Sequence, residues 1–194
     1  MTVEPLRQAF RRQVRERALE VAHQLTVDHG WDKVRVSEVA ERTGVSRPTL
    51  YHEFGDKQGL GEALVLRETE GFLIGVAAAL EQYGDDLAAG VAAAVGYTLA
   101  QADASPVLRA TLTSARGSDW LLPALTTRSA PVLLAASSVL GAWFAEHRPD
   151  LPPDVVAEAV DALVRLTVSH LVLPAHDRAE TIARLTRVAL RYVQ

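Results

Sequence analysis

Residues 30–60 read GWDKVRVSEVAERTGVSRPTLYHEFGDKQGL. This stretch predicts two short helices joined by a tight turn, with the cap of a third helix directly after them. Val36, Val39 and Ala40 recur at helical spacing, which gives the first short helix a buried face. Gly44 then tolerates the left-handed conformation that a chain reversal requires.

The second short helix has a clear start and two distinct faces. Ser46 supplies a side-chain acceptor for its free amides, and Pro48 falls in its first turn, where a missing N–H does no harm. Leu50 and Phe54, four residues apart, form its buried face. The remaining side chains point away from the core, and they are Arg47, Thr49, Tyr51 and His52. A short helix with hydrogen-bond donors on its free side is suited to enter a major groove, so the stretch predicts a DNA-binding protein.

The run TGVSRPTLYHEFGDK, from Thr43 to Lys57, resembles the head of the tetracycline-repressor-like (TetR) family of bacterial transcription regulators. The V-A-x-x-x-G-V-S, L-Y-x-x-F and K-x-x-L elements stand at the family's spacing. The resemblance implies an all-helical homodimer with an effector pocket in a variable C-terminal domain. This chain departs from the family by carrying Arg35 where a Thr or Ser usually caps the first short helix. Glu38 is placed to reach back to the free amide of residue 35 and keep half of a capping box.

The composition favours a helical protein of the cytoplasm. Hydrophobic residues make up 48% of the 194, and Ala and Leu dominate them. The chain has no cysteine, which excludes disulfides and thiolate metal sites and fits a reducing, cytoplasmic compartment. Its N-terminus is too charged for a secretory signal. The longest uncharged run, 129–145, contains Pro131 and a pair of serines, so we expect a buried helix there and no membrane span.

Charge is divided unevenly along the chain. Residues 1–57 hold ten Lys and Arg against nine Asp and Glu, a balance of +1, whereas residues 58–194 hold ten against fifteen, a balance of −5. An acidic body repels DNA, so only the head is expected to face it. With several phosphates neutralised per dimer, affinity is expected to fall roughly 10³- to 10⁵-fold between 50 and 200 mM salt.

We expect an all-α chain of about nine helices in two domains: a helix-turn-helix DNA-binding domain over 1–56, and a ligand-binding and dimerisation domain over 57–194. The helices are predicted over 6–29, 36–43, 47–54, 57–83, 86–102, 106–117, 129–147, 154–174 and 177–194. In the first, Arg7, Arg11 and Arg15 form one stripe, which is either a solvated face or a set of phosphate contacts.

The predicted DNA contacts divide into two groups. Base contacts are expected from Arg47 to a guanine edge, from Thr49 to a thymine methyl or a base edge, and from Pro48 to a methyl group. Phosphate contacts are expected from Tyr51, His52, Lys57, Ser37, Thr43 and Arg35. The alternative for Tyr51 is a core tyrosine whose hydroxyl reaches the surface.

The last two predicted helices are amphipathic and suit a hairpin that meets its own copy in a four-helix bundle. The residues expected at this dimer interface are Val156, Val160, Leu163, Leu171, Ile182, Leu185 and Ala189. The alternative is that both helices simply close the core of one chain. A two-fold protein is what a palindromic operator requires.

A small-molecule effector pocket is expected among the middle helices. Its candidate residues are Phe72, Tyr83, Tyr97, Arg109, Arg116, Trp120 and Trp143. Ordinary core positions for the aromatic residues, and surface exposure for the two arginines, are the alternatives. On the effector hypothesis, an apolar or amphipathic compound tilts the helix that begins at Lys57 and so moves the reading helix.

No catalytic constellation is found: G-x-S-x-G, H-E-x-x-H and glycine-rich phosphate loops are missing, and the histidines are scattered. We therefore expect no enzyme, no metal and no cofactor. The most favoured function is a DNA-binding regulator, a repressor released by an effector. The alternatives are a regulator that is constitutive or controlled by a protein partner, and a helical dimer with a decayed head, which the intact run from Gly44 to Lys57 disfavours.

Overall fold

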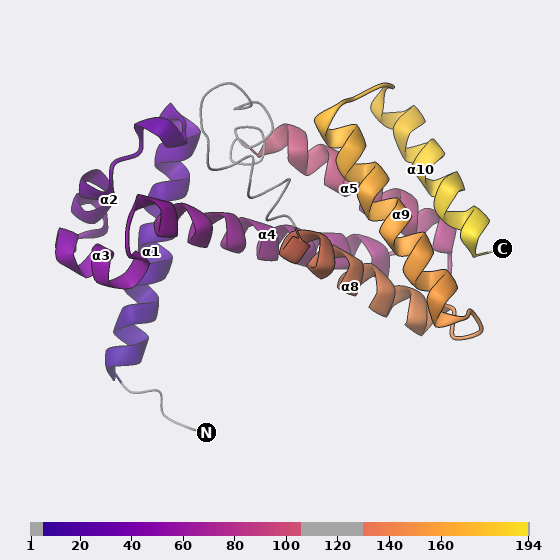
Figure 1. The fold of residues 1–194 in the computed structure, drawn as a ribbon, viewed down its shortest axis with the longest axis horizontal. Coiled ribbons are helices and arrows are strands. Elements are labelled where there is room, and N and C mark those ends of the chain that lie inside the picture. The colour runs from indigo at the N-terminus through magenta and orange to yellow at the C-terminus, as the bar shows by residue number, and fades with distance from the viewer. Residues whose placement is uncertain (1–5, 106–129, 194) are drawn as a thin grey trace. The chain divides into compact units, whose positions relative to one another are not determined.

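The computed structural model describes residues 6–105 and 130–193. These residues form eight α-helices, one 3₁₀ turn and no strand, which confirms the all-α prediction (Figure 1). The elements are α1 (Leu6–His29), η1 (Trp31–Lys33), α2 (Val36–Thr43), α3 (Arg47–Phe54), α4 (Lys57–Glu81), α5 (Leu87–Ala104), α8 (Ala130–His147), α9 (Pro153–Val172) and α10 (Arg178–Tyr192). The helix predicted over 106–117 lies outside the described residues.

The chain divides into two compact units, and the division falls between Glu68 and Thr69, inside α4. We call the described residues 6–68 the head, and residues 69–105 with 130–193 the body. The predicted domain boundary, between residues 56 and 57, lies earlier in the chain, at the start of α4.

The head has its own apolar core. α1 packs on η1 and α2, and α2 packs on α3. The buried side chains of α1 recur at three- and four-residue intervals, as an amphipathic helix requires, and they are Val14, Ala18, Leu19, Ala22 and Leu25. Val39 of α2 and Leu50 of α3 are at most 1% exposed. The buried faces expected for the two short helices are therefore present.

Four helices begin at a polar side chain that accepts a hydrogen bond from the amide three residues ahead. The pairs are Ser46 with Thr49, Asp56 with Gly59, Asp86 with Ala89 and Asp177 with Glu180. Each bond satisfies one of the amides that the first turn of a helix leaves without a partner, which is why the helices begin where they do.

The body is built around one hydrophobic cluster drawn from α4, α5, α8, α9 and α10. α10 packs on α5 and α9, and α8 packs on α9. This packing corrects part of the predicted dimer interface. Five of its residues are buried in this cluster within a single chain, namely Val156, Val160, Leu163, Leu185 and Ala189, and the other two, Leu171 and Ile182, pack against it. Both helices thus contribute to the core of a single chain, which is the role that the alternative gives them.

Among the described helices, none combines the length and the apolar character that crossing a membrane requires.

Candidate nucleic-acid interface

The turn between α2 and α3 depends on a single left-handed residue. Gly44 has φ 78° and ψ 29°, a conformation that costs a residue with a side chain free energy. The amide of Gly44 donates to Glu41 O, and the amide of Val45 donates to Ala40 O at 3.0 Å. These bonds close α2, and Ser46 then caps α3 with its side chain. The two short helices are thus joined by the tight turn that the sequence predicts.

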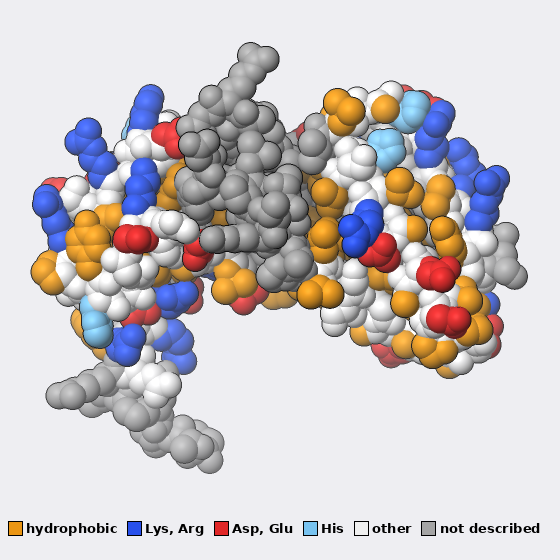
Figure 2. Space-filling model, in the orientation of Figure 1, with side chains coloured by type: hydrophobic (Ala, Val, Ile, Leu, Met, Phe, Trp, Pro, Cys, Tyr) orange, Lys and Arg blue, Asp and Glu red, His pale blue; other side chains and the backbone are white. Residues whose placement is uncertain are grey.

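The free face of α3 carries side chains suited to bind DNA. Arg47, Pro48 and His52 are exposed, and Tyr51 is 50% exposed. Tyr51 is therefore a surface residue and not a core tyrosine. Thr49 is half-buried, and its hydroxyl lies 2.8 Å from the Ser46 hydroxyl. Lys and Arg side chains stand out on the visible face of the head (Figure 2).

The opposite flank of α3 is fixed to α1 by a carboxylate between two arginines. Arg11 Nη2 donates to Glu53 Oε2 at 3.0 Å, and Arg15 Nη1 donates to Glu53 Oε1 at 3.3 Å. Arg15 also lies over the Phe54 ring, 5.2 Å from its centroid. Both arginines of the stripe that the structure describes in side-chain detail therefore bind α3. Phosphate contact, the other possibility for the stripe, would have to use the N–H groups that do not donate to Glu53.

Lys57 also has partners within the head. Its Nζ donates to Asp32 O at 3.0 Å and lies 5.4 Å from the centroid of the Trp31 ring. Burial lowers the pKa of Lys57, and the Asp32 carboxylate opposes this shift in part. The lysine thus joins the start of α4 to η1, a role that the sequence did not reveal.

Thr43, predicted to contact phosphate, is 7% exposed, and its Oγ1 is buried without a hydrogen-bond partner. A hydroxyl enclosed in the head cannot reach a phosphate oxygen, so this part of the prediction is wrong. Arg35 is exposed at the N-cap of α2, and its side chain makes no capping bond. The Glu38 carboxylate accepts from Arg42 at 2.8 Å, and no bond from the Arg35 amide to it is present among the described residues. Ser37 is half-buried.

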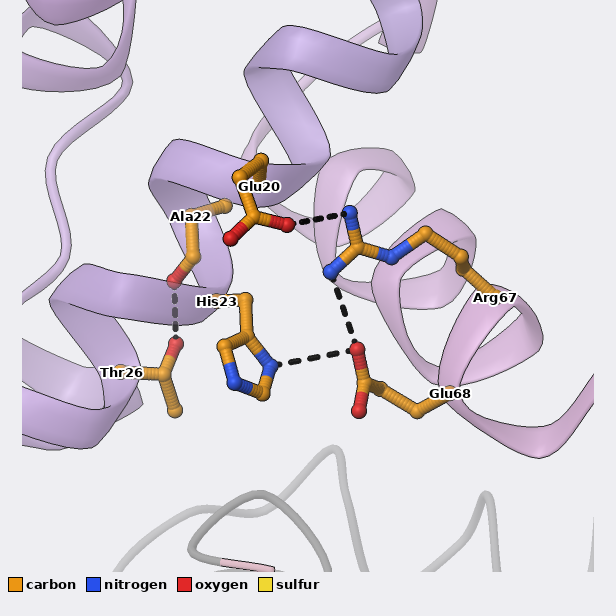
Figure 3. A network of polar contacts seen from close by, with 6 residues as sticks. All are labelled: Glu20, Ala22, His23, Thr26, Arg67 and Glu68. Atoms are coloured by element: carbon orange, nitrogen blue, oxygen red, sulfur yellow. Dashed lines mark hydrogen bonds and ion pairs between the residues drawn. The ribbon is translucent and has the colours of Figure 1, made fainter. Parts of the chain in front are cut away.

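The last residues of the head tie α4 back to α1 (Figure 3). Arg67 donates to Glu20 Oε2 of α1 at 3.4 Å and to Glu68 Oε1 at 3.0 Å. His23 Nδ1 lies 3.1 Å from the same Glu68 oxygen, within ion-pair range although the geometry is not that of a hydrogen bond. This network fixes α4 against α1 where α4 leaves the head.

The candidate pocket residues of the body fall into three groups. Phe72 and Tyr97 are half-buried and stack with their ring centroids 5.9 Å apart, and Trp143 is buried, with no partner for its Nε1. Tyr83 is 44% exposed in the turn after α4, so it is not a pocket wall in this structure. Arg109, Arg116 and Trp120 lie outside the described residues. Within the described ranges, no group of His, Cys, Asp and Glu is arranged to hold a metal ion.

Two family models match the chain. Residues 18–64 match "Bacterial regulatory proteins, tetR family", and residues 86–191 match "Bacterial Tetracyclin repressor, C-terminal domain". Together they cover most of the head and most of the body.

Known proteins resemble the chain over almost all of its length. It is 30% identical over 187 residues to the HTH-type transcriptional regulator AlkX of Mycobacterium tuberculosis (strain ATCC 25618 / H37Rv), over 93% of this chain and 87% of that protein. The crystal structure of the TetR family repressor AlkX from Dietzia sp. strain DQ12-45-1b, implicated in biodegradation of n-alkanes, superposes with a TM-score of 0.74 at 26% identity, over 92% of this chain and 95% of that one. Thermus thermophilus FadR, a TetR family repressor solved with lauroyl-CoA, shares the fold with a TM-score of 0.65 at 16% identity, over 93% of this chain and 95% of that one.

Proposed function

The chain belongs to the TetR family of bacterial regulatory proteins, and on that premise we propose that it represses transcription by binding a palindromic operator as a homodimer that a small effector releases. Family membership confirms that it is a DNA-binding helix-turn-helix transcription regulator and not an enzyme. The operator, the dimer and the effector belong to the proposal.

The observation that carries the proposal is the exposed face of α3. Arg47 is exposed beside a rigid turn and can donate two hydrogen bonds to a guanine edge. Pro48 is exposed and can touch a thymine methyl, whereas the half-buried Thr49 shares a hydrogen bond with the Ser46 hydroxyl. Direct readout of sequence therefore rests first on Arg47.

Tyr51 and His52 extend this face and are proposed to donate to phosphate oxygens. Arg35, at the N-cap of α2, and Ser37, in the first turn of α2, are proposed to contact the DNA backbone as well. The reason is that the N-terminus of a helix attracts anions. Lys57 donates one of its three N–H groups to Asp32 O, and the other two are proposed to reach a phosphate.

A homodimer is proposed because a palindrome presents its half-sites to two copies of one reading helix. Five of the seven residues first expected at the interface are buried within one chain, and Leu171 and Ile182 are half-buried, so most of the contact surface must come from other residues. Large apolar side chains remain exposed on and just after α9 and at the end of α10: Leu166 (38%), Val168 (38%), Leu173 (76%) and Tyr192 (42%). We assign the dimer contact to these outward faces of the α9–α10 hairpin.

An apolar effector is proposed for the body. The stacked pair of Phe72 and Tyr97, with Trp143 as a further aromatic residue, offers apolar surface together with a hydroxyl and an indole N–H that can orient a polar end group. The Dietzia relative is implicated in n-alkane degradation, and the Thermus relative binds lauroyl-CoA. Both point to a long aliphatic chain as the effector class. On this proposal the effector favours an arrangement in which α4, tied to α1 through Arg67, carries the head out of register with the operator.

The test is selection of duplexes by the full-length protein from a pool of random sequences. The expected result is an inverted repeat whose half-site separation corresponds to a whole number of helical turns, because two symmetric heads must meet the same side of the duplex. If the selected duplexes show no sequence preference, the proposal of a specific operator is refuted. Addition of fatty acids, acyl-CoA esters and n-alkanes to the selected complex then tests the effector, and an affinity that none of them changes would favour constitutive or protein-controlled regulation.

A further inference from the structure

Glu53 has an unusual position for a carboxylate on a DNA-reading helix. It is the penultimate residue of α3, its side chain is 13% exposed, and each of its two oxygens accepts from a different arginine of α1. Arg11 and Arg15 are four residues apart, so they lie on one face of α1. Their own side chains are 62% and 37% exposed, so the carboxylate is the enclosed member of the cluster.

The contacts determine how α3 is oriented. Its N-terminal end is fixed by the Gly44 turn and by the Ser46 cap. Its C-terminal end is fixed by Glu53 between the two arginines and by Arg15 over the Phe54 ring. With both ends held, the helix can neither rotate about its axis nor tilt freely. A bidentate contact to a base edge requires such placement, within about half an ångström.

The same contacts set the charge beside the reading helix. A bare carboxylate on α3 would repel a phosphate backbone, whereas the cluster of Glu53 with Arg11 and Arg15 carries a formal charge of +1. The carboxylate in turn offsets one of the two positive charges and accepts from Nε and Nη2 of Arg11 and Nη1 of Arg15, so these three donors are not offered to phosphates of any sequence. It therefore limits attraction to DNA that does not depend on sequence.

We propose that Glu53 is a positioning and specificity-determining residue: it holds α3 in the orientation that reads the operator, and it keeps Arg11 and Arg15 from binding DNA phosphates indiscriminately. This inference rests on the proposed operator binding. Glu53 itself touches no base.

The experiment compares Glu53→Gln with Glu16→Gln. Glu16 is an exposed residue of α1, so its replacement removes the same charge from the same head. Dissociation constants are measured for the selected operator and for a scrambled duplex over a range of salt concentrations. For E53Q the dissociation constant for the scrambled duplex, divided by that for the operator, is expected to fall about tenfold. This is the effect expected from losing one bidentate base contact. The salt slope of E53Q on the scrambled duplex is expected to steepen by about 0.9 for each arginine that turns to a phosphate.

A role in stability alone gives a different pattern. It would weaken binding to both duplexes alike and leave the salt slope unchanged, and that result would overturn the proposal. An E53Q protein that binds both duplexes as E16Q does would overturn it too. The variant Arg15→Gln and the double variant R15Q/E53Q complete a cycle. If Glu53 acts through Arg15, the double variant discriminates no worse than E53Q alone.

A measurement without DNA separates this inference from the proposed function. Amide hydrogen exchange in α3 is expected to be faster in E53Q than in E16Q, while exchange in α2 stays the same. If the wild-type protein did not distinguish operator from scrambled duplex, the proposed function would be wrong. The exchange rates would still show whether Glu53 holds α3, and equal rates in the two variants would refute that.

Discussion

Gly75 of α4 is the position where adding one methyl group has the clearest consequence. A Cβ built there would come within 2.8 Å of Tyr97 Cε1 and closer still to the end of that ring. Tyr97 is the partner of Phe72 in the stacked pair. Gly75→Ala therefore forces the Tyr97 ring to move away from the position in which the two rings stack.

The expected cost follows from three contributions. Forcing a side chain out of a packed position costs about 1 to 3 kcal/mol, and losing the aromatic pair adds about 0.5 to 1.5 kcal/mol. Replacing a helical glycine by alanine returns about 0.5 to 1 kcal/mol. The free energy of unfolding of the body is therefore expected to fall by about 0.5 to 4 kcal/mol.

Gly71 on the same helix provides the control, because nothing lies within 4 Å of a Cβ placed there and the residue is exposed. Gly71→Ala is expected to stabilise the protein by about 0.5 to 1 kcal/mol. The assay is urea unfolding followed by far-UV circular dichroism and by tryptophan fluorescence, since two units need not unfold together. In a Tyr97→Ala background the clash is gone, so G75A becomes stabilising. A G75A protein as stable as G71A would refute the reasoning.

Three further predictions concern the head and the dimer. Thr43→Val is expected to leave operator affinity unchanged and to raise the free energy of unfolding by about 1 kcal/mol, because it removes a buried hydroxyl that has no partner. A gel-shift titration measures the affinity, and thermal melting measures the stability. Arg47→Ala is expected to weaken operator binding by about 1 to 3 kcal/mol and to relax the preference at one base pair. Binding to single-base operator variants measures this preference. An equal loss of affinity on every variant would make Arg47 a phosphate contact. The double variant L166E/L173E places charge on the proposed dimer surface and is expected to give monomers in sedimentation velocity, and an unchanged dimer would move the interface elsewhere.

The sequence predicts well those features that neighbouring residues determine. The turn at Gly44 and the starts of helices at Ser46, Asp86 and Asp177 all depend on contacts within about four residues. These signals therefore located α2, α3, α5 and α10 closely. The short turn η1 was missed, because three residues carry no periodicity; buried Trp31 was its only signal.

What the sequence could not give is the partner of each side chain. The spacing of Arg11 and Arg15 shows that they share a face, but their acceptor, Glu53, lies 42 and 38 residues away along the chain. The sequence likewise predicts that Lys57 contacts phosphate and gives no sign that it donates to Asp32 O. Arg11 and Arg15, which were predicted to form a solvated or DNA-facing stripe, and Lys57, which was predicted to contact phosphate, thus all have partners within the head.

Amphipathic helices pose the same limit for the apolar residues. The periodicity of α9 and α10 shows which positions avoid water, but not whether the cover comes from the same chain or from a second copy. Val160 and Leu185 are covered by the chain's own helices, at 3% and 2% exposure. The surface that we propose for a partner includes Leu173, which lies just beyond the last turn of α9, so the spacing of the helix does not single it out.

The engaged cations also change the expected salt dependence. Beside the reading face, Arg35 and Arg47 are exposed cations with no ion pair among the described residues, and Lys33 on η1 is a third. If two or three of these charges per head contact phosphates, about four to six phosphates are neutralised per dimer. At about 0.9 per phosphate, affinity for the operator would fall roughly 10²- to 10³-fold between 50 and 200 mM salt, below the range expected from the sequence. Fluorescence anisotropy titrations across that range measure the slope. A fall of 10⁴-fold or more would mean that further cations of the head, such as Arg11, Arg15 or Lys57, also contact phosphates.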